Sequence, residues 1–395
     1  MYATDPTVRS RADLLSLGLD GVTALMGELG ERSFRAQQVF AWLHARGAAS
    51  IDAMTDLKKE LRARLASVAA LDAPVVDEVR VAADGTRKYR LVTVDGHAIE
   101  AVWIPHASGR GKNALCISSQ VGCAMGCTFC ATAALKLARH LTPGEIVGQL
   151  YAVVRDLEAA RVDAAAAGPA SDADLAGDDE DADASPRRFV QNIVFMGMGE
   201  PLHNLDGVLG AVRLLTHPAG QGMSPRRLTV STSGLVPEIA RLGAESDVHL
   251  AVSLNATTDD VRAAIMPVDK RWNIAALLEA CRAFPLKPRR RITFEYVLLA
   301  GVNDTDDDAR RLVALLRGIR TKVNLIPYNP HPLSPFARPA DARVDAFRAI
   351  LDAAHVSCFV RTTRGLDIDA ACGMLGARKL EDARKAGLPV LASSS

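Results

Sequence analysis

The sequence predicts an α/β protein whose parallel sheet is built from repeated strand–helix units. From residue 115 onward, short runs rich in β-branched and apolar residues alternate with stretches of helical periodicity. The six runs are 115–118, 192–196, 228–231, 249–254, 292–299 and 323–327. They are almost continuously apolar, as in parallel strands that are covered on both faces. Such repeats form either a partial barrel or a doubly wound sheet, and periodicity does not choose between the two.

The residues before this repeat predict a helical domain over 1–80 and a β-hairpin extension over 81–112. Apolar residues recur at helical spacing in two stripes. The first stripe contains Phe34, Val39, Phe40, Trp42 and Leu43, and the second contains Met54, Leu57, Leu61 and Leu65. Two alternating runs are joined through Asp95-Gly96, a dipeptide that favours a hairpin turn. We expect the repeat to occupy 113–380 and a short tail to follow over 381–395.

The composition excludes several classes of protein. The 395 residues are 49% apolar and 24% charged, so they can bury a large core without disulfide bonds. No apolar run reaches the ~20 residues that span a bilayer. Residues 1–30 lack the apolar centre of a signal peptide. Seven cysteines in such a chain indicate metal or redox chemistry in a reducing compartment, so we expect a cytoplasmic protein with no membrane partner.

The segment 161–187 interrupts the strand–helix pattern. Residues 163–185 include eight acidic residues and no Lys or Arg, and large apolar residues are almost absent. Such a segment cannot bury enough surface to offset its ordering entropy, so we expect a disordered acidic insertion. The whole chain has 47 basic and 46 acidic residues, so the remainder carries nine more basic than acidic residues. That excess suits a polyanionic partner.

Three cysteines form the sharpest motif of the chain. Cys123, Cys127 and Cys130 follow the first expected strand with the spacing C-x3-C-x2-C, so one loop brings three soft thiolates together. Structural zinc normally has four ligands in paired spacings, and His140 lies outside the usual spacing. A purely structural group of buried thiols is another alternative. We favour one 4Fe–4S cluster, because three thiolates leave one iron open to activate a small molecule.

The ends of four of the other expected strands carry mostly small and polar residues. They are Gly199, Glu200, Ser231, Ser253, Leu254, Asn255 and Asn329. Each alone is compatible with ordinary turn chemistry. Together they lie at the carboxyl ends of parallel strands, where barrel enzymes bind their ligands. The sequence therefore predicts a ligand site at this rim.

These motifs resemble known families. The cysteine triplet, the intervening Phe129 and the strand–helix units resemble the radical S-adenosylmethionine (SAM) enzymes. Longer motifs are similar to the RNA adenine-C2 methyltransferases, namely Ser-Ser-Gln-Val-Gly-Cys ending at Cys123, Gly-Met-Gly-Glu-Pro around Glu200, Ser-Thr-Ser-Gly from Ser231 and Asp-Ala-Ala-Cys-Gly around Cys372. The similarity runs from Arg35 to Gly376, and one departure is Asn255, where many relatives have His. The resemblance implies a partial (β/α)6 barrel, a 4Fe–4S cluster on the three cysteines and SAM at the polar rim.

The same resemblance assigns roles to three further residues. Cys372 would carry the methyl group as S-methylcysteine, and Glu100 would accept a proton. Cys116 would attack the sulfur of Cys372 and leave a transient disulfide between them. The reaction implied is methylation of adenosine C2 in 23S rRNA and in tRNA, next to the anticodon, with two SAM molecules per turnover. Its further partners would be an electron donor of the flavodoxin or ferredoxin type and a dithiol reductant.

Basic clusters are compatible with an RNA partner, although each is also compatible with a solvated surface. They are Lys287 with Arg289-Arg290-Arg291, Arg226-Arg227, and Arg361 with Arg364.

Two alternatives to C2 methylation stay open. The first is methylation of C8 on the same rRNA adenosine, because enzymes of both kinds share these motifs. The second is a non-catalytic iron–sulfur sensor that binds RNA, although a sensor needs no methyl carrier.

Overall fold

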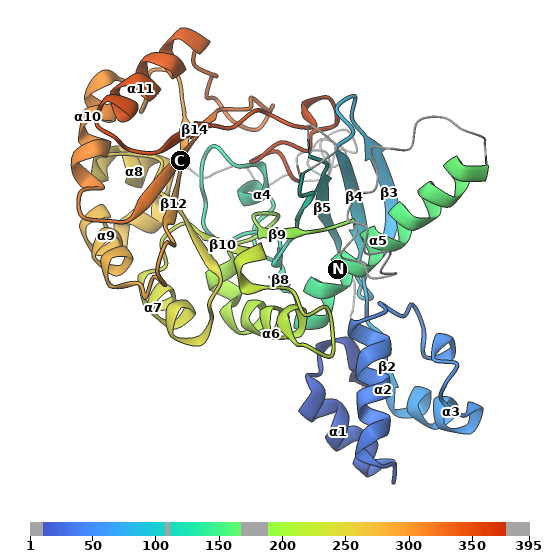
Figure 1. The fold of residues 1–395 in the computed structure, drawn as a ribbon. Helices are drawn as coiled ribbons and strands as arrows, with labels where there is room; N and C mark the ends of the chain where they lie inside the picture. Colours follow the sequence, from blue (N-terminus) through green and yellow to red (C-terminus); the bar gives the residue numbers. More distant parts are fainter. Residues whose placement is uncertain (1–10, 107–110, 167–188, 377–395) are drawn as a thin grey trace.

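Seven parallel strands lie side by side in chain order (Figure 1). The computed structural model describes residues 11–106, 111–166 and 189–376, and the seven belong to a ten-stranded sheet in these residues. They are β6 (Ala114–Cys116), β9 (Asn192–Phe195), β10 (Leu228–Thr232), β11 (His249–Ser253), β12 (Ile292–Leu298), β13 (Thr321–Pro327) and β14 (Cys358–Val360). A doubly wound sheet reverses its strand order at a switch point. The unbroken order therefore confirms the partial barrel.

The first six of these strands are the six that the sequence predicts, with ends shifted by at most two residues. Strand β12 shows how they separate the two faces of the sheet. Tyr296 is fully buried and its ring lies 5.4 Å from that of Phe347, whereas the neighbouring Glu295 lines the central pocket. Side chains alternate across a strand, so apolar residues face the helices and polar residues face inward. The surrounding helices are α5 (Pro143–Ala166), α6 (Leu205–Thr216), α7 (Val236–Glu245), α8 (Asp259–Ile265), α9 (Ile274–Ala283), α10 (Asp306–Leu315) and α11 (Asp341–Ala353).

Three antiparallel strands extend the sheet beyond β6. They are β3 (Val75–Val81), β4 (Arg87–Val92) and β5 (Ala98–Ile104). β4 and β5 form the expected hairpin, and Gly96 in its turn has a φ of 81°, which glycine adopts without strain. Val102 of β5 lies opposite Cys116 of β6, so the hairpin continues the inner face of the barrel. Strand β3 corrects the expected boundary of the helical domain, because residues 75–80 form part of the sheet instead.

The N-terminal helices form a separate group below the barrel in Figure 1. They are α1 (Leu19–Glu28), α2 (Ser33–His44) and α3 (Lys59–Val68). Met54 of the second expected stripe is buried, but it precedes helix α3, which begins only at Lys59. Phe34 of the first stripe is 46% exposed and does not belong to the core. His44 connects the group to the barrel through a hydrogen bond of 3.0 Å with the Tyr151 hydroxyl.

The expected start of the disordered insertion lies within a helix. Helix α5 continues to Ala166, so the boundary placed at Arg161 is wrong. The rest of the insertion and the tail over 381–395 lie outside the described residues. Among the helices of the described residues, none combines the length and the apolar character needed to cross a membrane. The other strands of the described residues are β1 (Ala12–Asp13), β2 (Ala69–Ala70), β7 (Gln120–Val121) and β8 (Arg139–His140), and the other α-helix is α4 (Ala131–Ala134).

Candidate active site

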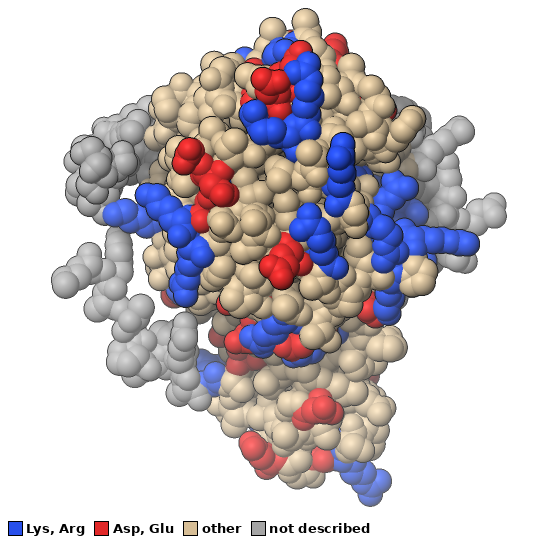
Figure 2. All heavy atoms as spheres, turned by 90° about the vertical axis from the view of Figure 1, so that its left-hand side faces the viewer, with Lys and Arg blue, Asp and Glu red and all other residues tan. Residues whose placement is uncertain are grey.

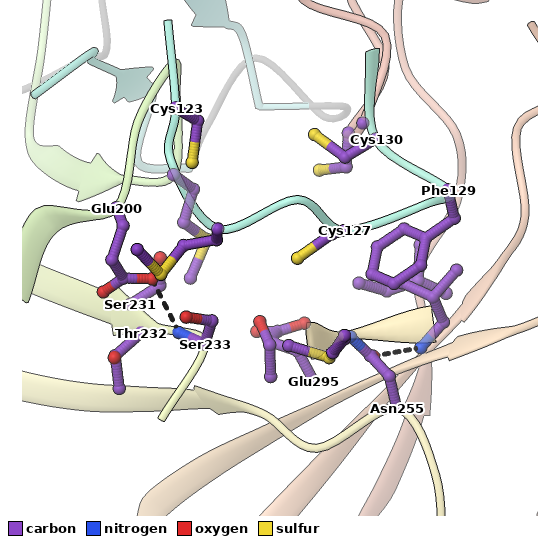
Figure 3. A pocket seen from close by; sticks show the side chains of 18 of the residues that line it. Cys123, Cys127, Phe129, Cys130, Glu200, Ser231, Thr232, Ser233, Asn255 and Glu295 are labelled. Carbon is purple, nitrogen blue, oxygen red and sulfur yellow. Dashed lines mark hydrogen bonds between the residues drawn. The ribbon is translucent and has the colours of Figure 1, made fainter. Parts of the chain in front are cut away.

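The cysteine loop connects β7 to helix α4. Gly122 at its start has a φ of 77° and lies so close to the Lys136 carbonyl that any side chain would collide with it. Further along, the Cys130 amide donates to the Cys127 carbonyl at 3.1 Å and folds the loop back on itself. Figure 3 shows the sulfur atoms of Cys123, Cys127 and Cys130 pointing toward the space that the loop encloses. The three thiols line one pocket, as the sequence predicts.

The donor set of this loop fits an iron–sulfur cluster. Burial raises the pKa of the Cys123 thiol to about 12 and that of the Cys127 thiol well above its ordinary value. Both thiols therefore keep their protons at neutral pH until a metal displaces them. In the described part of the chain, no three His, Cys, Asp or Glu side chains are arranged to hold a single metal ion. Soft thiolates around a shared space suit a cluster, in which each binds a different iron atom.

Glu200 connects the ends of two neighbouring strands beside the cysteine loop. Its Oε1 accepts from the Leu202 amide at 3.1 Å, and its Oε2 accepts from the Ser233 amide at 2.7 Å. Burial raises the pKa of this carboxyl group, and the two amides oppose that shift. Gly199 precedes it with a φ of 101°, and a side chain there would collide with Gln120. The loop after β9 can therefore approach a ligand closely.

Six of the seven expected ligand-binding residues line the pocket with the cysteines. They are Gly199, Glu200, Ser231, Ser253, Asn255 and Asn329. Leu254 does not line it, because its side chain is fully buried in the core. Asn255 adopts a φ of 56°, and its Oδ1 accepts from the Val297 amide at 2.8 Å. Its side-chain NH2 donates to the Met266 sulfur at 3.2 Å, and its carbonyl oxygen accepts from the Asn303 side chain at 2.6 Å, so these groups also have partners within the protein.

Arg262 organises this rim, although the sequence does not predict it. Its guanidinium group is fully buried and forms an ion pair of 2.8 Å with Asp269. It also donates to the carbonyl oxygens of Ser233 at 2.6 Å, Leu254 at 3.0 Å and Ser253 at 3.2 Å. The carboxyl ends of β10 and β11 are thereby fixed by one side chain. Nothing in the sequence around Arg262 distinguishes it from a solvated arginine on a helix.

Two charged residues of the pocket were also not expected there. Glu295 lines it from β12 and accepts from the Asn324 amide group at 2.9 Å. Burial raises the pKa of Glu295, and the positive charge of Arg361 opposes the shift. Arg361, which belongs to one of the basic clusters of the sequence, follows β14 and lines the same pocket. The pocket therefore contains a cation close to its acidic residues and thiols.

The segment after β14 brings Cys372 over the cysteine loop. Cys372 lines the pocket, and the next residue, Gly373, accepts at its carbonyl from the Ala131 amide at 2.8 Å. Gly376 donates its amide to Oε2 of Glu100, also at 2.8 Å. Cys116 is buried on β6 outside the pocket lining, and burial together with the nearby Cys372 raises its pKa to about 12. The structure thus gathers the three residues that the resemblance singled out around one segment.

The basic clusters of the sequence separate in space. Arg289, Arg290 and Arg291 line a cleft together with Arg317, Arg320 and His355. This arginine cleft lies at the amino ends of β12, β13 and β14, away from the rim that holds the pocket. No Asp or Glu lies among the described residues that line it. Figure 2 shows the face seen from the left of Figure 1, where Asp and Glu lie among many of the Lys and Arg side chains.

Comparison with known proteins identifies the family. A model described as the ribosomal RNA large subunit methyltransferase N-terminal domain matches residues 12–71, and one of the Radical SAM superfamily matches 179–313. The chain is 48% identical over 374 residues to the dual-specificity RNA methyltransferase RlmN 2 of Myxococcus xanthus, covering 94% of this chain and 93% of that protein. It is 49% identical over 365 residues to the RlmN of Anaeromyxobacter dehalogenans, with 92% of each chain covered.

A solved structure agrees with these relatives. The crystal structure of a radical SAM methyltransferase from Sphaerobacter thermophilus superimposes with a TM-score of 0.82 and 41% identity. The match covers 93% of this chain and 99% of that one. The likeness therefore includes the helical group, the hairpin and the barrel together. The chain belongs to the RlmN family of radical SAM RNA methyltransferases.

Proposed function

We propose that this chain methylates C2 of adenosine in 23S rRNA and tRNA, with Cys372 as the methyl carrier. The observation that carries the proposal is the position of Cys372, which lines the same pocket as the three cysteines of the loop. Adenine C2 is an electron-poor carbon, so it cannot attack a methyl sulfonium as an amine or an alcohol would. A one-carbon radical on a carrier can add to the ring instead. A thiol that faces the pocket is suited to be that carrier.

The pocket would hold two groups. Cys123, Cys127 and Cys130 would bind a 4Fe–4S cluster through their thiolates. The rim residues would bind SAM, and they are Gly199, Glu200, Ser231, Ser253, Asn255 and Asn329. When bound, the cluster and SAM supply a 5′-deoxyadenosyl radical. A separate SAM molecule provides the methyl group of Cys372, so a turnover consumes two.

Glu100 and Cys116 would release the product. Glu100 takes the C2 proton of the adenosine that is covalently attached through Cys372. The unpaired electron of the adduct would return to the cluster. Cys116 then loses its own proton and attacks the Cys372 sulfur, a disulfide forms, and the carbon–sulfur bond breaks with its electron pair on the methylene carbon, which takes a proton to become the methyl group. The protein is then oxidised by two electrons, so a dithiol reductant must reset it. A donor of the flavodoxin or ferredoxin type would supply the electron for SAM cleavage.

Nucleoside mass spectrometry tests the position of methylation. A strain that lacks the gene should contain no 2-methyladenosine in 23S rRNA or tRNA, and expression of this chain should restore it in both. Restoration of 8-methyladenosine instead would assign the C8 reaction. A cluster-loaded protein that binds RNA but restores neither nucleoside would be a sensor rather than an enzyme.

The arginine cleft supports RNA as the partner of this site. Arg289, Arg291 and Arg317 are exposed, and among the described residues none of them forms an ion pair with a carboxylate. Phosphate contacts by such side chains give affinity that falls steeply with salt and carries little sequence information. Because the cleft lies at the opposite end of the strands from the pocket, it would bind a distant part of a large folded RNA.

Neutralising the cleft should therefore weaken binding without changing the chemistry. In a triple variant with Gln at Arg289, Arg291 and Arg317, we expect the KM for 23S rRNA to rise severalfold while kcat stays constant. The slope of log K against log salt should become shallower by about 0.7–0.9 for each phosphate group that the variant no longer neutralises. Filter binding at a series of salt concentrations measures the slope, and steady-state turnover measures KM and kcat.

A matched control comes from arginines that already have acidic partners. Arg310 pairs with Asp307, Arg343 with Asp306 and Arg348 with Asp352. Replacing these three by Gln removes the same charge from the outer helices and should leave the salt slope unchanged. If the cleft variant and the wild-type protein have the same slope of log K against log salt, the cleft is not part of the RNA-binding surface.

A further inference from the structure

Lys88 on strand β4 has an almost completely enclosed side chain. Only 4% of its surface is exposed, and its ammonium nitrogen lies 3.1 Å from Oε2 of Glu100. The same ammonium group donates to the Asp369 carbonyl at 3.0 Å. Asp369 stands three residues before Cys372 in the chain. One cation therefore contacts both the expected proton acceptor and the segment that carries the expected methyl carrier.

The register of the hairpin makes this contact selective. Glu100 lies directly opposite Arg90, and Lys88 lies diagonally across the same face of the sheet. Arg90 is exposed and forms its ion pair with Asp77 of β3 instead. The Glu100 carboxylate thus takes its cation from the buried lysine rather than from the arginine opposite it.

The energetics of burial indicate that this charge has a use. An ammonium group loses its hydration when it is buried, and one ion pair restores only part of that free energy. A methionine of similar length would fill the same space without this cost. Buried ion pairs contribute little stability compared with apolar residues, but they select one geometry. The Lys88–Glu100 pair therefore fixes a carboxylate more than it stabilises the fold.

The hydrogen bonds of Glu100 show what is fixed. Oε2 forms the ion pair with Lys88 and accepts a hydrogen bond from the Gly376 amide, whereas within the described residues Oε1 has no hydrogen bond. We propose that Lys88 is a positioning residue for Glu100, holding Oε2 so that Oε1 can take the C2 proton of the attached adenosine. The hydrogen bond from Lys88 to the Asp369 carbonyl holds the segment that carries Cys372 beside Oε1 of Glu100. This inference rests on the proposed function.

The test separates proton removal from the earlier steps. In Lys88→Met, cluster content and S-methylation of Cys372 should match the wild-type protein. The covalent protein–RNA adduct should resolve about tenfold more slowly, as followed by denaturing electrophoresis in single-turnover reactions with premethylated enzyme. Lys88→Arg keeps a cation on a longer side chain and should slow resolution less than Met does. Equal slowing of methylation and resolution, or no slowing in either variant, overturns the proposal.

Two further variants give the matched controls. Arg90→Met removes an equally cationic residue from the same face of β4 and should leave adduct resolution unchanged. In Glu100→Gln/Lys88→Met, no buried charge is left without a partner, and resolution should be no slower than in Glu100→Gln alone. Additive effects of the two substitutions would show that Lys88 acts elsewhere.

The same experiment distinguishes this inference from the proposed function. If Glu100→Gln resolves the adduct at the wild-type rate, the proton-accepting role of Glu100 is wrong, whatever Lys88 does. If Glu100→Gln accumulates the adduct while Lys88→Met does not, the role of Glu100 stands and only the role of Lys88 is wrong.

Discussion

Cys372→Ala should transfer no methyl group to RNA and should form no covalent complex with it. The variant has no sulfur to carry the methyl group, so the reaction fails before the nucleobase is attacked. Its cluster content and its cleavage of SAM should persist, because Cys372 is not one of the three cysteines of the loop. Incorporation of labelled methyl groups into RNA measures the loss, which we expect to be complete.

Cys116→Ala should fail at a later step. It can still accept the methyl group and attach to adenosine, but it lacks the thiol that attacks the Cys372 sulfur. A protein–RNA species should therefore accumulate that survives denaturing electrophoresis and disappears on ribonuclease digestion. If both cysteines were merely structural, the two variants would be similarly destabilised and would trap no RNA. A Cys116→Ala protein that methylates adenosine at the wild-type rate would disprove the resolving role.

Cys127→Ala should lose both the cluster and the cleavage of SAM. Two thiolates cannot hold a 4Fe–4S cluster with the same open iron, so iron content after anaerobic reconstitution should fall to background. The absorbance of the thiolate-to-iron charge-transfer bands measures the loss of the cluster. The yield of 5′-deoxyadenosine measures the loss of SAM cleavage. The variant should still fold, because its side chain points into the pocket rather than into the core (Figure 3).

Cys281 provides the control for that experiment. It is buried in helix α9 and does not line the pocket, so Cys281→Ala removes a thiol without touching the site. We expect full iron content and normal SAM cleavage, with a stability loss of about 1 kcal/mol from the small cavity. Full iron content in Cys127→Ala would contradict the assignment of the loop.

Local patterns predicted the repeat because each long parallel strand is marked by its own composition. Runs such as 292–299 are apolar enough to stand out without knowledge of their neighbours. β3 and β14 were missed for the opposite reason. β14 has only three residues, and Val75 and Val81 at the ends of β3 are exposed, so only pairing with β4 and β13 defines these two strands.

The difference between local patterns and contacts with distant residues also explains which parts of the candidate site the sequence predicts. The cysteine loop is contiguous in sequence, so its spacing alone predicts that three thiols share one site. Lys88, Arg262 and Glu295 act through partners that are distant in sequence or through burial, neither of which the sequence displays. Burial also distinguishes Leu254 from the other expected rim residues, since its side chain lies in the core just beyond the end of β11, whereas Ser253 lines the pocket.

The hydrogen bonds made by Gly373 and Gly376, in the segment that carries Cys372, also set the order in which the site is assembled during protein synthesis. Glu100 bonds to Gly376, which follows it by 276 residues, and the cysteine loop is tied to Gly373 over a similar separation. At about 5–20 residues per second, the hairpin leaves the ribosome roughly 14–55 s before its partner exists. A chain released early would present all three loop cysteines but no Cys372. Metal loading before the end of translation would therefore create a centre that lacks its carrier thiol.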